Sequence, residues 1–179
     1  MPENVTLDPT AIAVLAFVAV QRLAELAYAR RNEARLRAQG AVEFSREHYW
    51  AIVTLHSAWL AGLLLMAPGE LPNLFWLLIF VALQALRFWV LATLRERWTT
   101  RIIVLPGAPL MRDGPYRFMR HPNYAIVIAE IFVLPMVFGL YAYALVFSLL
   151  NAGILAVRIH AEDCALQRAS SPGRSIRKR

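Results

Sequence analysis

The stretch that decides the fold is YAIVIAEIFVLPMVFGLYAYALVFSLLNAGILAV, residues 124–157. It is about twice as long as the roughly 20 residues that one helix needs to cross a bilayer core of about 30 Å. Pro135 and Gly139 lie near its middle. Proline removes a backbone donor and glycine relaxes the chain, so a tight turn is favoured there. The stretch therefore predicts a helical hairpin, with one long kinked helix as the alternative.

The rest of the chain is equally apolar. Hydrophobic residues make up 59% of it, against about 45–50% in ordinary soluble domains. A chain of 179 residues is too short to bury that excess in a core, and its 17% of charged residues excludes disorder. We expect an all-α integral membrane protein, a single domain over residues 1–179. Its five transmembrane helices are expected at 10–29, 49–67, 74–94, 124–138 and 141–157.

Positive charge predicts the orientation of these spans. Sixteen of the 19 Lys and Arg residues lie in three segments, 30–46, 95–120 and 168–179, whereas residues 1–9 and 68–72 have none. Basic loops stay in the cytoplasm. We therefore expect a multi-pass protein of the cytoplasmic membrane, with its N-terminus outside and its C-terminus inside. The charge lies between apolar runs, so it predicts no nucleic-acid partner. Arginine far exceeds lysine, which is typical of a GC-rich bacterial genome.

Several common site motifs are missing from the sequence. It has no G-x-G, H-E-x-x-H, C-x-x-C or G-x-S-x-G, and Cys164 is its one cysteine. These absences argue against a dinucleotide or phosphate loop, a cysteine-based zinc site and a serine hydrolase. We expect no metal site.

Polar residues gather in two segments, 98–124 and 158–168. A hairpin over 124–157 brings them to the same face of the membrane, whereas a single span would separate them. Pro122 suits the first turn of a helix, whose free N–H groups attract an anion. Arg158 and Glu162, four residues apart, share a helix face. The two segments could hold a zwitterion, its carboxylate on the N–H groups and its ammonium on Glu162. The alternative is an ordinary surface pair of Arg158 with Glu162.

Two motifs at this spacing resemble a known family. GPYRFMRHPNY (114–124), followed after the hairpin by R-x-x-x-E-D-x-x-L (158–166), is similar to the isoprenylcysteine carboxyl methyltransferase family of membrane enzymes, which use S-adenosylmethionine. RNEARLRAQGAVEF (31–44) and RWTTRIIVLPG (97–107) look most like a bacterial branch found with type III polyketide synthases. That branch is understood to O-methylate long-chain alkylpyrones or alkylresorcinols.

The resemblance implies roles for individual residues. The loop 98–123 would bind the cofactor, and residues 158–179 would form a C-terminal helix and tail. Arg158 would lie on the substrate side, and His121 and Arg158 would be catalytic. The family usually has two glutamates where this chain has Glu162 and Asp163, so Glu162 is the more secure of the two. The cofactor-binding residues would be Ala108, Pro109, Leu110, Met111, Tyr116, His121, Pro122, Asn123, Tyr124 and Glu162.

The chemistry of the acceptor decides whether a base is needed. A carboxylate needs none, but a phenol or an enol must lose a proton. The candidate bases are His160, His121, His56 and Glu130. Glu130 is the most unusual, because an acid inside an apolar run is costly and by default suggests function. Alternatively, Glu130 pairs with Arg87 or hydrogen-bonds His56 to hold helices together.

The sequence thus predicts an S-adenosylmethionine-dependent O-methyltransferase of the membrane. Its expected substrate is lipophilic, a polyketide-derived alkylpyrone or alkylresorcinol, which implies a functional link to a type III polyketide synthase. The alternatives are methylation of isoprenylcysteine carboxyl groups, N-methylation of phospholipids, and a membrane scaffold that binds a soluble partner without catalysis.

Overall fold

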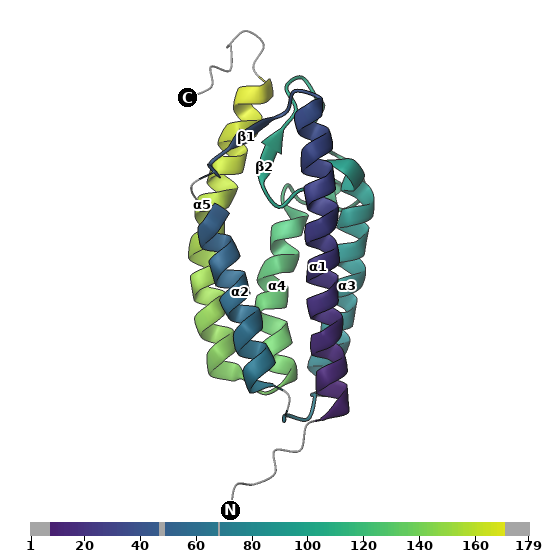
Figure 1. The fold of residues 1–179 in the computed structure, drawn as a ribbon, viewed down its shortest axis with the longest axis vertical. Helices are drawn as coiled ribbons and strands as arrows, with labels where there is room; N and C mark the ends of the chain where they lie inside the picture. The colour runs from purple at the N-terminus through teal and green to yellow at the C-terminus, as the bar shows by residue number, and fades with distance from the viewer. Residues whose placement is uncertain (1–7, 47–48, 68, 171–179) are drawn as a thin grey trace, which may run out of the picture.

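The computed structural model describes residues 8–46, 49–67 and 69–170. Within them five helices form a bundle whose members run along its long axis (Figure 1). Each predicted apolar run lies in one of them, except that the runs 49–67 and 124–138 extend one residue past the end of their helices. The helices are α1 (Pro9–Ala38), α2 (Tyr49–Met66), α3 (Leu74–Leu94), α4 (Pro122–Val137) and α5 (Tyr141–Ser170).

Four of these helices, α1, α2, α3 and α5, are long and apolar enough to cross a membrane. The fifth, α4, is apolar but has only 16 residues, about 24 Å at 1.5 Å per residue. That is shorter than a bilayer core. Ten of its 16 residues are buried, so α4 is enclosed by the other helices over most of its length. The membrane-protein class is confirmed, whereas five full spans and the orientation of the termini stay predictions.

The hairpin exists, and the alternative of one kinked helix is wrong. Helix α4 ends at Val137 and α5 begins at Tyr141, and the two pack side by side (Figure 1). Gly139 takes φ +68°, a left-handed conformation that glycine adopts without strain. The Leu140 N–H donates to the carbonyl of Pro135 at 3.0 Å and closes the turn. The two polar segments therefore lie at the same end of the bundle.

Two helices continue well beyond their apolar runs at that end. Helix α1 was expected to cross the membrane over 10–29, but it runs on to Ala38 because RNEARLRA is rich in good helix formers. Helix α5 likewise continues past residue 157. These extensions carry charged residues and stand beside the loops of the same end (Figure 1).

A small sheet joins those loops, which an all-α prediction misses. Strand β1 (Val42–Phe44) pairs antiparallel with β2 (Ile102–Val104), with Glu43 opposite Ile103. Glu43 accepts from Arg37 at 2.5 Å and from Arg101 at 2.6 Å. Burial raises the pKa of Glu43, but the hydrogen bonds and charges of the two arginines outweigh burial, so that its pKa lies below the usual value. The sheet ties the α1–α2 connection to the α3–α4 connection.

Candidate functional site

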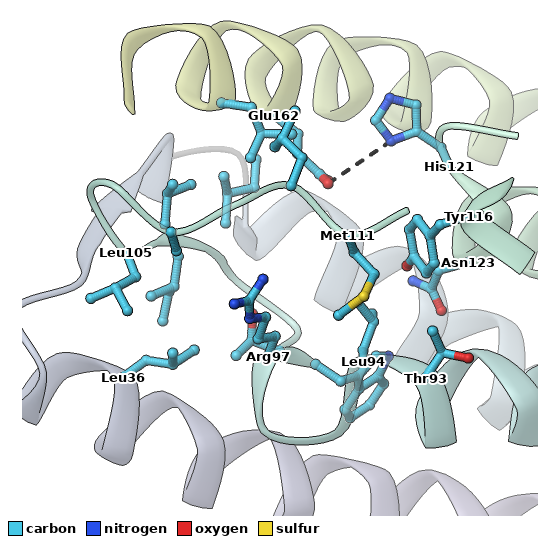
Figure 2. Close-up of a pocket in the computed structure, with 18 of the residues that line it drawn as sticks. Leu36, Thr93, Leu94, Arg97, Leu105, Met111, Tyr116, His121, Asn123 and Glu162 are labelled. Atoms are coloured by element: carbon cyan, nitrogen blue, oxygen red, sulfur yellow. Dashed lines mark ion pairs between the residues drawn. The ribbon is translucent and has the colours of Figure 1, made fainter. Parts of the chain in front are cut away.

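A cavity of about 1530 Å³ lies at the end of the bundle that carries the sheet. Its walls come from the end of α1, the end of α3, the 95–113 loop, the start of α4 and the extension of α5 (Figure 2). Both polar segments that the sequence singled out therefore contribute to one cavity, as the hairpin requires.

Tyr124 connects the two sides of the hairpin. The Arg158 Nε donates to the Tyr124 hydroxyl at 3.0 Å, and that hydroxyl donates to a carboxylate oxygen of Glu162. The Arg158 Nη2 also donates to the carbonyl of Thr100 at 2.5 Å. Arg158 and Glu162 are thus joined through a phenol from α4, which differs from the simple surface pair that their spacing allowed.

His121 lies between two carboxylates. Its Nε2 is 3.2 Å from Oδ1 of Asp163, and its Nδ1 is 3.9 Å from Oε1 of Glu162. Figure 2 shows the second of these pairs as a dashed line. Asp163, which the sequence ranked below Glu162, therefore takes part in the same cluster. The carboxylates of Glu162 and Asp163 therefore give negative charge to the wall of the cavity that they share with His121 and Tyr124.

Another part of the lining comes from the loop that precedes α4. Residues 108–111 all line the cavity, and Arg97 holds this segment by donating to the carbonyl of Pro109 at 2.7 Å. Tyr116, in the 3-10 turn η3 (Gly114–Arg117), lies beside Asn123 (Figure 2). Burial and the negative charge of Glu162 both raise the pKa of Tyr116, so its phenol stays neutral.

Nine of the ten cofactor-binding residues expected from the sequence line this cavity. The exception is Pro122, which is buried in the first turn of α4 and is not part of the lining. Its contribution is to the helix start, because its fixed φ and missing N–H suit that position.

Sequence reasoning missed the residues that reach the cavity from α1 and α3. Leu36 lines it from the α1 extension, and Thr93 and Leu94 line it from the end of α3 (Figure 2). Leu36 lies in the RNEARLRAQGAVEF stretch (31–44), whose resemblance to a bacterial branch gave no role to a single residue. No motif marks Thr93 or Leu94, which lie in an ordinary apolar helical stretch.

Glu130 lies outside the cavity, among other charges. It is 2% exposed and accepts from Arg87 Nη1 at 2.7 Å, Arg22 Nη2 at 2.7 Å and Gln84 at 2.9 Å. Arg87 also binds both carboxylate oxygens of Glu25, at 2.6 and 2.8 Å. We define the ion-pair network as Arg22, Glu25, Arg87 and Glu130; it joins α1, α3 and α4. This is the helix-holding alternative that the sequence left open, with Arg87 as the partner.

The other two candidate bases are also away from the cavity lining. His56 donates from Nδ1 to the carbonyl of Ile52, one turn earlier in α2, at 2.8 Å. His160 is exposed, and its nearest polar contact is Cys164 at 3.7 Å. Of the four candidates, His121 alone is a lining residue.

The cavity wall suits a zwitterionic cofactor. Glu162 and Asp163 offer negative charge to an ammonium, and the N-terminus of α4 offers positive potential to a carboxylate. The side-chain oxygen of Asn123 is buried and accepts no hydrogen bond from the described residues. A buried acceptor of this kind favours a ligand that brings a donor.

Comparison with known proteins agrees with this geometry. The profile of the isoprenylcysteine carboxyl methyltransferase family matches residues 76–168, which include most of α3, the loop, all of α4, and α5 past the acidic cluster. An uncharacterized protein of Bacillus subtilis (strain 168), YpbQ, is 41% identical over 162 residues, covering 88% of this chain and 96% of that protein. An uncharacterized protein of Haemophilus influenzae is 29% identical over 153 residues, covering 81% of this chain and 88% of its own. No solved structure matches the chain.

The family profile covers more than half of the chain, and it contains α4 and nearly all of α5 with the side chains that meet between them. The chain therefore belongs to the isoprenylcysteine carboxyl methyltransferase family.

Proposed function

We propose that this protein transfers a methyl group from S-adenosylmethionine to an oxygen of a lipophilic acceptor, most specifically a polyketide-derived alkylpyrone or alkylresorcinol. The observation that carries the proposal is the meeting of His121 and Tyr124 with Arg158 and Glu162 around one large cavity. Family membership supports methyltransferase activity and this methyl donor.

The negative wall would hold the donor. When bound, S-adenosylmethionine supplies an electrophilic methyl group on a sulfonium. Glu162 and Asp163 would bind its ammonium, and the α4 N-terminus with Asn123 would bind the other polar groups of the amino-acid part. The backbone of 108–111 and the neutral Tyr116 would contact the rest.

Arg158 would act on the acceptor side. Two of its nitrogens are held by Tyr124 and Thr100, which fixes the direction of the guanidinium. A fixed cation next to the donor attracts an oxygen that carries negative charge and aligns it for in-line attack. The position at the end of the bundle allows a polar donor to enter from water and a lipophilic acceptor to enter from the bilayer.

His121 would take the proton if the acceptor is a phenol or an enol. It lines the cavity, and Asp163 at 3.2 Å orients its ring. Glu130 is assigned a structural role instead, because Arg87 and Arg22 already neutralise it.

Methylation of a prenylcysteine carboxylate is the second candidate, because it is the activity that describes the family. The two candidate reactions differ in whether the acceptor must lose a proton before it is methylated. A carboxylate acceptor is already ionised, so at saturating donor His121→Asn would leave the turnover of a carboxylate nearly intact, whereas the turnover of a phenol or an enol that is neutral at the assay pH would fall by about 10²–10⁴-fold.

Donor binding can be tested by titrating S-adenosylhomocysteine into the detergent-purified protein. We expect Glu162→Ala and His121→Ala to weaken binding at least tenfold. Arg30→Ala, an exposed residue of α1 outside the cavity lining, is the control and should bind like the parent. If only the control loses binding, or if all variants bind equally, the assignment of the donor site to Glu162 and His121 is refuted.

The acceptor needs a separate assay. Methyl-labelled donor is offered with an alkylpyrone, an alkylresorcinol, a prenylcysteine or phosphatidylethanolamine in parallel reactions. Label on the pyrone or resorcinol supports the proposal, and label on prenylcysteine supports the second candidate. Label on the phospholipid amine, or donor binding without transfer to extracted bacterial lipids, contradicts both. A type III polyketide synthase gene beside this one would support the polyketide link independently.

A further inference from the structure

The chain between two cavity residues exposes two large apolar side chains. Tyr116 and His121 both line the cavity, and the four residues between them, Arg117-Phe118-Met119-Arg120, are all exposed, although the two arginines also reach the cavity lining. Phe118 is 77% exposed and Met119 48% exposed, although both are large apolar side chains. We call residues 117–120 the RFMR segment.

A close packing contact sets the depth of this segment. Gly114, at the start of η3, lies so close to α3 that a Cβ there would clash with Thr93 and would be 3.2 Å from Trp89 Nε1. Phe118 lies beside the same helix, with its ring 6.5 Å from that of Trp89. The RFMR segment is therefore held at the level of the last turns of α3.

That level corresponds to the edge of the hydrocarbon. Helix α3 has 21 residues, about 31 Å, which matches a bilayer core of about 30 Å. Trp89 is five residues before the end of α3, about 7 Å inside it. An aromatic ring at this depth lies in the outer part of the acyl chains, just below the headgroups and close to the interface that tryptophan prefers. Phe118 shares that position.

We propose that the RFMR segment is an interfacial anchor for an anionic lipid surface, with Phe118 and Met119 in the acyl boundary and Arg117 and Arg120 on lipid phosphates. Apolar side chains flanked by arginines fit this boundary in charge and polarity. The segment connects two residues of the cavity, so lipid contact also sets the separation of Tyr116 and His121. Anionic lipid is then a positive effector of cofactor binding, a step that rests on the proposed function.

Insertion is tested on the full chain in lipid nanodiscs. Cys164→Ala removes the native thiol, and Met119→Cys is labelled with a bimane fluorophore. We expect quenching by phospholipids brominated near the head end of the acyl chain and little quenching by iodide in water. Ala38→Cys, exposed at the end of α1, is the matched control and should respond in the opposite way. If both labels respond like the control, the anchor is refuted whether or not the protein binds a cofactor.

Coupling is tested by the affinity for S-adenosylhomocysteine in discs of phosphatidylcholine with and without phosphatidylglycerol. We expect about fivefold tighter binding with the anionic lipid. Arg117→Gln with Arg120→Gln should abolish this ratio, whereas Arg30→Gln with Arg31→Gln, the same loss of charge on exposed α1 positions, should retain it. Arg117 and Arg120 also reach the cavity lining, so their replacement can change the affinity itself. The readout is therefore the ratio of the affinities measured with and without phosphatidylglycerol. If Arg117→Gln with Arg120→Gln leaves this affinity ratio unchanged, coupling is refuted. If the protein binds no S-adenosylhomocysteine in any lipid, the proposed function is refuted and the anchor is not.

Discussion

The buried charges between α1, α3 and α4 give a sharp prediction about Glu130. Replacing Glu130 with alanine removes the acceptor of three hydrogen bonds, from Arg22, Arg87 and Gln84. The network then changes from two arginines and two glutamates to an excess of one positive charge at bilayer depth. Breaking a buried ion pair by removing one partner destabilises a fold by about 3–5 kcal/mol.

The contacts that Arg87 and Arg22 keep without Glu130 place the expected loss of stability at the low end of that range. Arg87 keeps both bonds to Glu25, and Arg22 keeps one at 2.9 Å and is partly exposed. We therefore expect about 3 kcal/mol for Glu130→Ala. Glu130→Gln keeps the shape and loses the charge, so we expect about half of that effect.

The assay is equilibrium unfolding in mixed micelles, followed by helical circular dichroism. A matched control is Glu96→Ala, which removes an ion pair of 2.5 Å with Arg35 whose side chains are 42% and 63% exposed. Such a surface pair contributes at most about 1 kcal/mol. Methyl transfer by the folded fraction of Glu130→Gln should equal that of the parent. The reasoning is refuted if Glu130→Gln is as stable as the parent and loses turnover, because Glu130 would then be a catalytic group.

Three further outcomes are expected. Glu162→Gln should weaken binding of S-adenosylhomocysteine about tenfold without lowering the melting temperature, measured by calorimetric titration; unchanged affinity would contradict a charge contact with the ammonium. The pKa of Glu43 is lowered on folding, so its pairing with Arg101 stabilises the fold above the usual pKa of 4.5 and is lost as the pH falls through the lower folded pKa. In Glu43→Gln the melting temperature should therefore fall less than in the parent as the pH is lowered from 5 to 3. An equal fall in both proteins would contradict this. Gly62→Ala should destabilise the protein by about 1–3 kcal/mol, because a Cβ there clashes with the Tyr143 hydroxyl, and Tyr143→Phe should restore part of it; equal loss in the double variant would show another cause.

The local sequence was enough to predict the hairpin and the residues of α4 and α5 that meet at the site. The length of 124–157 with Pro135 and Gly139 was enough to indicate a turn, since span length and helix breaking are short-range properties. Once the turn is in place, Tyr124 and Arg158 must approach each other. The pairing of His121 with Asp163 shows the limit of this reasoning, because the side chain ranked lower by resemblance makes the shorter contact.

The role of Glu130 was open in the sequence for a physical reason. An acid within an apolar run must be neutralised, but its partner depends on which helices lie beside it and at what rotation. Arg87 and Arg22 come from two other helices, 43 and 108 residues away in the chain. The β1–β2 pair was missed for the same reason, because three-residue strands acquire their hydrogen bonds only after the helices place the two loops together.

The sequence by itself determined the membrane class, the apolar helices and the residues that the hairpin turn brings together, because hydropathy and turn chemistry act over a few neighbouring residues. Only the tertiary structure decided that α4 is an enclosed short helix, that α1 and α3 complete the cavity, and that the buried acids are paired away from it. Those outcomes depend on how separate helices pack, and packing is a property of surfaces formed after the local structure exists.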